Sequence, residues 1–269
     1  MDLGLAHRAV LVTGASRGIG RAIAQSFSAE GCRLRLVARD QDRLEEARGA
    51  LVRDYRVEVE TLAMDLANPG SAKAVFRRWP DVDVVVNNAG AIPRGSLADI
   101  DEAAWRSAWE LKVFGYINMT REYYRAMCGR RRGVIINVIG LAAEKLDYDY
   151  VAGSTGNAAL VAFTRTVGSM SLDYGVRVLG VNPGWVETER SMKSLRGRSL
   201  ELFGDEERWR ELIADWPAGR LIAAKEIADV VVFLASDLAG AVCGQIVTVD
   251  GGFGGRSYPA LDKRRSSTT

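Results

Sequence analysis

Seven short, almost wholly apolar runs alternate along the chain with longer stretches in which apolar residues recur at helical spacing. The helical stretches include GRAIAQSFSAEG and QDRLEEARGALVRDY. Strands that are apolar on both faces and separated by helices are typical of a parallel sheet covered on both sides. The pattern predicts an α/β fold, a single Rossmann-type doubly wound domain with a seven-stranded parallel sheet and helices on both faces. The predicted strands are Ala9–Gly14, Arg33–Ala38, Val57–Asp65, Val82–Gly90, Gly133–Gly140, Val176–Gly184 and Gln245–Gly252.

The alternation continues without an internal repeat or a linker, so one domain is expected over residues 1–255. Residues 189–216, rich in both apolar and charged side chains, are expected to form a lid over the substrate, and residues 256–269 a flexible tail. In this fold, ligands bind beyond the carboxyl ends of the strands, where the strand order reverses. That rule brings TGASRGIG, NNAG, Ile139–Gly140 and NPGWVET to one rim of the sheet.

Composition narrows the class of function. The chain has 269 residues, with 36 basic against 34 acidic side chains. This near balance gives no excess of positive charge that would favour binding to nucleic acid or to an anionic membrane. Its three cysteines are far apart and His7 is its one histidine, so neither a disulfide framework nor a zinc site is expected. No apolar run reaches eighteen residues. A cytoplasmic protein that binds a small molecule, with no metal, is the expectation.

The segment TGASRGIG follows the first predicted strand and opens the first predicted helix. Gly14 permits a tight turn, and Gly18 and Gly20 let the backbone approach a pyrophosphate at the helix N-terminus. A glycine-rich fragment alone is a weak signal, but here strand, turn and helix are in register. The segment therefore predicts a dinucleotide site.

TGASRGIG, Asp65-Leu66, NNAG, NPG, WPAGRLIAAKEIADVVVFLAS and VDGG together resemble the short-chain dehydrogenase/reductase family, in order and over roughly residues 5 to 255. The resemblance implies an NAD(P)-binding carbonyl/alcohol oxidoreductase. It also implies a homodimer or homotetramer, assembled through helices around residues 105–127 and 153–169 and through the last strand. The cofactor-binding residues that it implies are Gly14, Ser16, Arg17, Gly18, Ile19, Gly20, Arg39, Asp65, Leu66, Asn88, Ala89, Gly90, Pro183, Gly184, Val186 and Thr188.

The end of the second predicted strand bears on which dinucleotide binds. NAD enzymes usually carry a carboxylate there for the ribose 2′-hydroxyl, whereas this chain has Ala38 followed by Arg39. Arg39 and Arg17 could together hold a 2′-phosphate through charge-assisted bonds, which favours NADP(H) over NAD(H). Asp40 leaves an alternative open, because a register shift of one residue would make it the ribose carboxylate.

The family's usual catalytic side chains are absent from the positions that match its motifs. Members of the family use Ser, Tyr and Lys with an assisting Asn, where Tyr exchanges a proton with the carbonyl oxygen and Lys holds the nicotinamide ribose. The matching positions hold Gly140 for Ser, Gly153 for Tyr, Asn157 for Lys and Lys112 for Asn. This substitution of all four argues against ordinary carbonyl chemistry.

Lys112 and Asn157 look exchanged relative to the family pattern. Lys112 could bring its ammonium to the nicotinamide ribose from the neighbouring helix, while Asn157 hydrogen-bonds the ribose hydroxyls. The alternative is that Lys112 is a solvated helix residue and Asn157 has no role.

Tyr150 offers a second candidate for the missing chemistry. It precedes Asn157 by seven residues, which resembles the Tyr-to-Lys spacing of bacterial enoyl-acyl carrier protein reductases, a divergent branch of the family. A tyrosine about one helical turn before the usual position could still reach the substrate and donate the proton. The alternative is a packing or substrate-lining role.

The sequence thus predicts an NADP(H)-dependent oxidoreductase with a rearranged active site, made of Tyr150, Lys112 and Asn157. Its substrate is expected to be a small or medium hydrophobic carbonyl, alcohol or enoyl compound. The alternative is a nucleotide-binding regulator or scaffold that kept the cofactor site and lost the chemistry.

Overall fold

The computed structural model describes residues 2–256 and contains a seven-stranded sheet in the order β3-β2-β1-β4-β5-β6-β7. Every neighbouring pair of strands is parallel, as the sequence predicts. Several strands are shorter than expected, because the chain leaves the sheet directly after Thr13, Asn87 and Val138, and β3 and β4 each begin two residues later than expected. The predicted tail lies outside the described residues except for Arg256. The strands are β1 (Ala9–Thr13), β2 (Arg33–Ala38), β3 (Val59–Ala63), β4 (Val84–Asn87), β5 (Gly133–Val138), β6 (Val176–Pro183) and β7 (Ile246–Val249).

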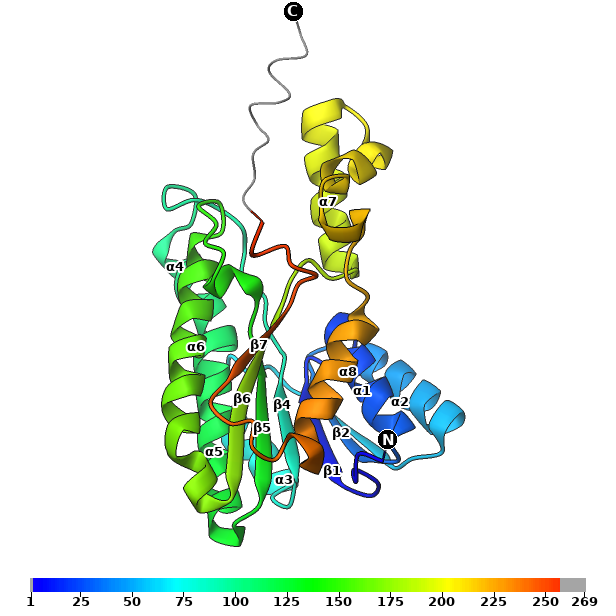
Figure 1. Ribbon diagram of the computed structural model, residues 1–269, viewed down its shortest axis with the longest axis vertical. Helices are drawn as coiled ribbons and strands as arrows, with labels where there is room; N and C mark the ends of the chain where they lie inside the picture. The colour runs from blue at the N-terminus through cyan, green and yellow to red at the C-terminus, as the bar shows by residue number, and fades with distance from the viewer. Residues whose placement is uncertain (1, 257–269) are drawn as a thin grey trace, which may run out of the picture.

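Helices cover both faces of the sheet (Figure 1). One face carries α1 (Gly18–Ala29), α2 (Gln41–Tyr55) and α8 (Ala224–Ala235), and the other carries α3 (Ser71–Arg78), α5 (Gly115–Arg130) and α6 (Val151–Ser171). Helix α4 (Glu102–Trp109) leads into α5. Helix α7 (Glu189–Phe203) lies beyond the carboxyl edge of the sheet (Figure 1). Among the described helices, none has both the length and the apolar character needed to cross a membrane.

The strands are buried because successive side chains point to opposite, equally covered faces. Val10 and Val12 enter the core beneath α1 and α8, where they join Phe27, whereas Leu11 between them enters the core beneath α5 and joins Tyr123. All five side chains are fully buried, and each such side chain contributes roughly 1.5–3 kcal/mol to folding. The two cores hold the carboxyl edge of the sheet rigid.

A chain of buried amides and hydroxyls fixes that edge. The amide of Asn87, at the end of β4, donates to Asn137 on β5 (2.9 Å) and to Thr120 on α5 (3.2 Å). The amide of Asn137 in turn donates to Thr164 on α6 (2.9 Å). Buried polar groups that are paired in this way specify one arrangement of the elements that carry them.

The helix that begins as α4 passes through a single π turn before it continues as α5. The π turn spans Glu110–Phe114 and is closed by a bond from the Gly115 N–H to the Glu110 carbonyl. Such turns insert one extra residue into a helix and occur often at functional sites. Lys112 lies in this turn, and its side chain is directed inward, only 8% exposed.

Candidate active site

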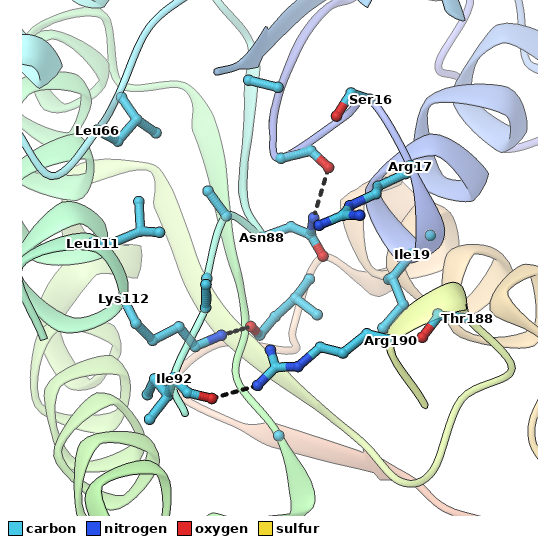
Figure 2. Close-up of a pocket in the computed structure, with 18 of the residues that line it drawn as sticks. Ser16, Arg17, Ile19, Leu66, Asn88, Ile92, Leu111, Lys112, Thr188 and Arg190 are labelled. Atoms are coloured by element: carbon cyan, nitrogen blue, oxygen red, sulfur yellow. Dashed lines mark hydrogen bonds between the residues drawn. The ribbon is translucent and has the colours of Figure 1, made fainter. Parts of the chain in front are cut away.

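A cavity of about 890 Å³ opens at the carboxyl ends of β1 and β4, where the strand order of the sheet reverses. Its walls come from the loops that follow β1 to β6 and from the π turn that carries Lys112. Figure 2 shows the glycine-rich loop on one side of the cavity and Lys112 with Ile92 on the other. The cavity therefore lies where the fold predicts a ligand.

The glycine-rich loop is shaped by close backbone contacts. Gly14 has a φ of +67°, and a Cβ there would lie 2.9 Å from the Ala89 Cα. A Cβ on Gly20 would lie 2.3 Å from the Gly14 carbonyl oxygen, so α1 can pack against its own entry loop only with glycine at this position. Helix α1 begins without a capping side chain or an acidic residue in its first turn. Its free N–H groups, together with Gly18 on the cavity wall, form a site for an anion such as phosphate.

Asn88 joins the glycine-rich loop to the loop after β4. Its side-chain amide donates to the Thr13 carbonyl (3.0 Å), and its backbone N–H donates to the Thr13 hydroxyl (2.9 Å). The expectation that Asn88 stabilises this edge agrees with these bonds, which hold Ala89 and Gly90 against the cavity.

Three arginines line one end of the cavity. Arg17 and Arg43 each place a guanidinium nitrogen 3.3 Å from the Glu189 carboxylate, and Arg39 lies 3.9 Å from Asp65. Hydrogen bonding from Arg43, and less from Arg17, lowers the pKa of Glu189. Asp40 caps α2 by accepting the Arg43 N–H (3.0 Å).

Arg39 lies directly after the last residue of β2. Strand β2 ends at Ala38, and Asp40, which caps α2, also lines the cavity. The alternative in which Asp40 serves as the ribose carboxylate therefore stays open. The three arginines outnumber Asp40 and Glu189 among the lining residues, so this end of the cavity is basic on balance.

Lys112 occupies the opposite end of the cavity. Its ammonium donates to the Tyr116 hydroxyl (2.8 Å) and to the carbonyls of Val138 (2.8 Å) and Ile139 (3.1 Å). Burial, followed by the positive charge of Arg190, lowers the pKa of Lys112 to about 7. The interpretation of Lys112 as a solvated helix residue is wrong, because the π turn directs it into the cavity.

A different tyrosine from the expected one bonds to Lys112. Tyr116, on α5, also donates to the Val138 carbonyl (2.9 Å). Burial, followed by the nearby Tyr150, raises the pKa of Tyr116 well above its usual value of 10. Among the described residues no hydrogen bond joins Lys112 directly to Tyr150.

Tyr150 fills the space that a side chain at position 153 would take. A Cβ on Gly153 would lie 2.0 Å from the ring of Tyr150, the residue that directly precedes α6 and lines the cavity. Glycine at the family's tyrosine position is thus coupled sterically to the tyrosine that stands one turn earlier.

Gly140 and Asn157 show a second coupling of the same kind. Gly140 has a φ of +146°, which disfavours any other residue, and a Cβ there would lie 2.9 Å from the Asn157 amide nitrogen. Asn157 is 4% exposed, and its amide oxygen has no hydrogen-bond partner within residues 2–256. The Asn157 amide therefore takes the space of the missing serine.

Apart from Gly20, Asp65 and Val186, every residue that the sequence predicts for the site lines the cavity. Gly20 packs behind the glycine-rich loop, and Asp65 lies at the edge beside Arg39. Val186 is buried and pairs with Ile222 behind the wall. Thr188 lies opposite Gly18 and caps α7 through its hydroxyl. The structure thus brings Tyr150, Lys112 and Asn157 to one end and the basic residues to the other.

Three residues of the site escaped sequence reasoning: Arg43, Tyr116 and Arg190. Tyr116 carries a helical signal, because it follows Lys112 by four residues along one continuous helix. Arg43 lies in the first turn of α2, four residues after Arg39, which precedes the helix. Arg190 follows Thr188 by two residues and could have been suspected as a charge inside a motif.

The lid differs from the expectation in one respect. Its apolar side chains were expected to floor the substrate pocket, but Leu195, Trp209 and Ile213 form a cluster of their own with Leu221. Of residues 189–216, only Glu189 and Arg190 line the cavity. The segment stands above the carboxyl edge of the sheet (Figure 1), and its first two residues place charged groups in the cavity wall.

Comparisons with known proteins agree with this geometry. Residues 14–254 match the family described as enoyl-(acyl carrier protein) reductase. Galactitol 2-dehydrogenase (L-tagatose-forming) of Cereibacter sphaeroides is 33% identical over 244 residues, which are 90% of this chain and 93% of that protein. The 3-oxoacyl-(acyl-carrier-protein) reductase of Escherichia coli strain K12 is 32% identical over 250 residues, 90% and 95% of the two chains. L-Sorbose reductase from Gluconobacter frateurii, complexed with NADPH and L-sorbose, has a TM-score of 0.89 and 31% identity, with 96% of this chain and 100% of that chain covered.

Proposed function

The chain belongs to the short-chain dehydrogenase/reductase family, and on that premise we propose that it is an NADP(H)-dependent oxidoreductase with a rearranged active site. Its substrate is a small or medium carbonyl, alcohol or enoyl compound. The observation that carries the proposal is the buried ammonium of Lys112, which faces the same cavity as Tyr150 and the glycine-rich loop.

The residues present fit a dinucleotide phosphate. The uncapped start of α1 suits the pyrophosphate, and the three arginines at the basic end suit a 2′-phosphate. The unpartnered Asn157 amide oxygen lies at the other end, where a ribose hydroxyl would serve as its donor once the side chain adjusts. Bound there, the cofactor would supply the hydride that moves between nicotinamide C4 and the substrate carbon.

Protein groups would then position the substrate and move the proton. Lys112 would hold the nicotinamide ribose, as the family's lysine does, but from the π turn and by exchanging one of its three present hydrogen bonds for a ribose hydroxyl. Tyr150 exchanges the proton with the substrate oxygen. The Tyr116 hydroxyl accepts a hydrogen bond from the Lys112 ammonium and so fixes its position. Tyr150 lies close enough to Tyr116 to raise the pKa of the Tyr116 hydroxyl.

Cofactor selectivity provides the first test. We expect the protein to bind NADPH about tenfold or more tightly than NADH, roughly 1.4 kcal/mol, because guanidiniums recognise phosphate by charge-assisted bonds. Arg39→Ala should remove most of that preference, and Arg43→Ala should reduce it. Isothermal titration calorimetry with both cofactors measures the ratio. Equal affinities for NADPH and NADH in the unmutated protein would contradict the assignment.

One observation favours a second candidate function. With Gly140 at the family's serine position, the side chain that polarises the carbonyl is missing, which suits a cofactor-binding regulator without turnover. A panel of ketones, aldehydes and enoyl thioesters, assayed by NADPH oxidation, distinguishes the two. Turnover of any panel member supports the enzyme, whereas tight NADPH binding without turnover supports the regulator.

A homodimer or homotetramer remains part of the proposal, as does a cytoplasmic location. Leu160, which could have served either core or interface, is fully buried inside the protomer. Phe114 is 45% exposed and Met170 57% exposed along the helix pair that the family resemblance implicates. Light scattering at micromolar concentration should give a mass of about two or four times the 29.3 kDa chain, and a mass of one chain would reject this assembly.

A further inference from the structure

Arg190 reaches across the inner end of the cavity. From the second position of α7, its guanidinium donates to the Ile92 carbonyl on the opposite wall at 2.5 Å. Figure 2 shows this side chain extended toward Ile92 and Lys112, away from the glycine-rich loop. The guanidinium carries five N–H donors, so several remain for a ligand.

The charges that line the cavity are unequally distributed. Its acidic lining residues are Asp40 and Glu189, and both pair with arginines at the basic cofactor end. At the inner end, Lys112 is held by a phenol and two carbonyls, all of them neutral. Among the described residues that line the cavity, neither carboxylate is paired with Arg190 or Lys112.

A third cation near this end is already neutralised. Arg94 stacks over the Tyr150 ring with 5.6 Å between its guanidinium carbon and the ring centroid, and it pairs with Asp147 at 2.7 Å. The uncompensated charge thus rests on Arg190 and Lys112. Two cations that share a partly buried space repel each other, and proteins keep such arrangements chiefly where a ligand supplies the opposite charge.

We propose that Arg190 forms an anion subsite that takes a carboxylate of the substrate, with the positive charge of Lys112 beside it. The three N–H donors of Lys112 already bond to Tyr116, Val138 and Ile139, so Lys112 contributes charge and Arg190 contributes the hydrogen bonds. The proposal deepens the proposed function, since it makes the substrate a carbonyl or hydroxy acid whose carboxylate stays chemically unchanged. The phosphates of the cofactor have other donors, at the start of α1 and at Arg17, Arg39 and Arg43. Ile92, Ile139 and Tyr150 line the same end and would contact the carbon chain.

Binding of matched probes tests the subsite without relying on turnover. Butyrate and its uncharged isostere butyramide are titrated calorimetrically into the protein, both cofactor-free and saturated with NADP⁺. We expect butyrate to bind at least about tenfold more tightly than butyramide near pH 6, where Lys112 is protonated. Arg190→Gln should abolish the difference, and Arg190→Lys should restore part of it. Arg198→Gln, an exposed α7 arginine that pairs with Glu201 outside the cavity, is the matched control and should keep it.

Each contrary outcome has its own meaning. Equal binding of butyrate and butyramide by the unmutated protein, or a preference that survives Arg190→Gln, overturns the subsite. Loss of NADP⁺ affinity in Arg190→Gln, without a change in the butyrate preference, assigns Arg190 to the cofactor and also overturns it. If NADP⁺ does not bind but the cofactor-free protein prefers butyrate, the proposed function fails and the anion subsite stands.

Discussion

Replacing Lys112 by methionine is expected to lower turnover by about two to four orders of magnitude, the usual range for acid–base partners, without unfolding the protein. Methionine matches the length of the lysine stem but cannot hold a ribose hydroxyl or place a charge near Tyr150. The exchange removes the cost of burying a cation that has no anionic partner, but it leaves the Ile139 carbonyl without this donor at a cost of about 1–3 kcal/mol, so little net change in stability is expected. Single-turnover NADPH oxidation and thermal unfolding measure the two effects.

The stability effect has a defined pH dependence. Burial lowers the pKa of Lys112 from 10.5 to about 7, so between these values the unfolded chain binds a proton that the folded protein lacks. Stability from this group therefore rises as pH increases from about 7 to about 10, and the full cost of burying the charge is present below pH 7. In Lys112→Met the free energy of unfolding should therefore lose this part of its increase between pH 7 and pH 10. The charged or titratable groups facing Lys112 are Arg190 from α7, Tyr116 from α5 and Tyr150 at the start of α6.

Lys225→Met serves as the control, because Lys225 is exposed and pairs with Asp229 on the surface of α8. It should change neither turnover nor the pH dependence of unfolding by a measurable amount. A Lys112→Met protein that unfolds at lower temperature but keeps full turnover per folded molecule would make Lys112 a structural residue, and the proposed chemistry would need other groups.

The fold and the cofactor end could be predicted from the sequence because their determinants are local. Apolar runs such as Ala9–Thr13 indicate buried parallel strands, and the spacing of Gly14, Gly18 and Gly20 directly after that run indicates a phosphate-binding turn. The strand end at Ala38 likewise decides the place of Arg39. Each of these features follows from the residues beside it.

The substrate end depends on contacts between distant segments, which spacing alone does not reveal. A π turn, which the regular helical pattern around Lys112 did not announce, decides that this side chain is buried. The hydrogen-bond partner of Lys112 is Tyr116. The geometry of the helix brings these two side chains together, and no family motif contains them both. Arg190 meets Ile92 only because α7 starts across the cavity from the loop after β4. Reasoning by aligned positions identified Lys112, Tyr150 and Asn157 but not what they contact.

Tyr150→Phe is expected to reduce turnover by about two to four orders of magnitude while NADPH affinity changes little, if its hydroxyl exchanges the proton. The ring would keep its place over Gly153, so only the hydroxyl is lost. Stopped-flow measurement of NADPH oxidation, together with calorimetry of cofactor binding, separates the two effects. Unchanged turnover in Tyr150→Phe would leave the ring with a packing or lining role.

The coupling between Tyr150 and Gly153 provides the sharper experiment. On propensity alone, Gly153→Ala should stabilise α6 by up to about 1 kcal/mol, since alanine favours the helix over glycine. A Cβ at that position would lie 2.0 Å from the Tyr150 ring, so the ring must move away from the place from which its hydroxyl reaches the substrate. Gly153→Ala should therefore lose turnover nearly as severely as Tyr150→Phe. In a protein that already carries Tyr150→Ala, Gly153→Tyr should recover at least about tenfold in turnover, because the tyrosine then starts from the family's usual position and the space over Gly153 is vacant. If Gly153→Ala keeps full turnover, or the relocated tyrosine recovers none, then the place of the Tyr150 ring does not govern the proton transfer.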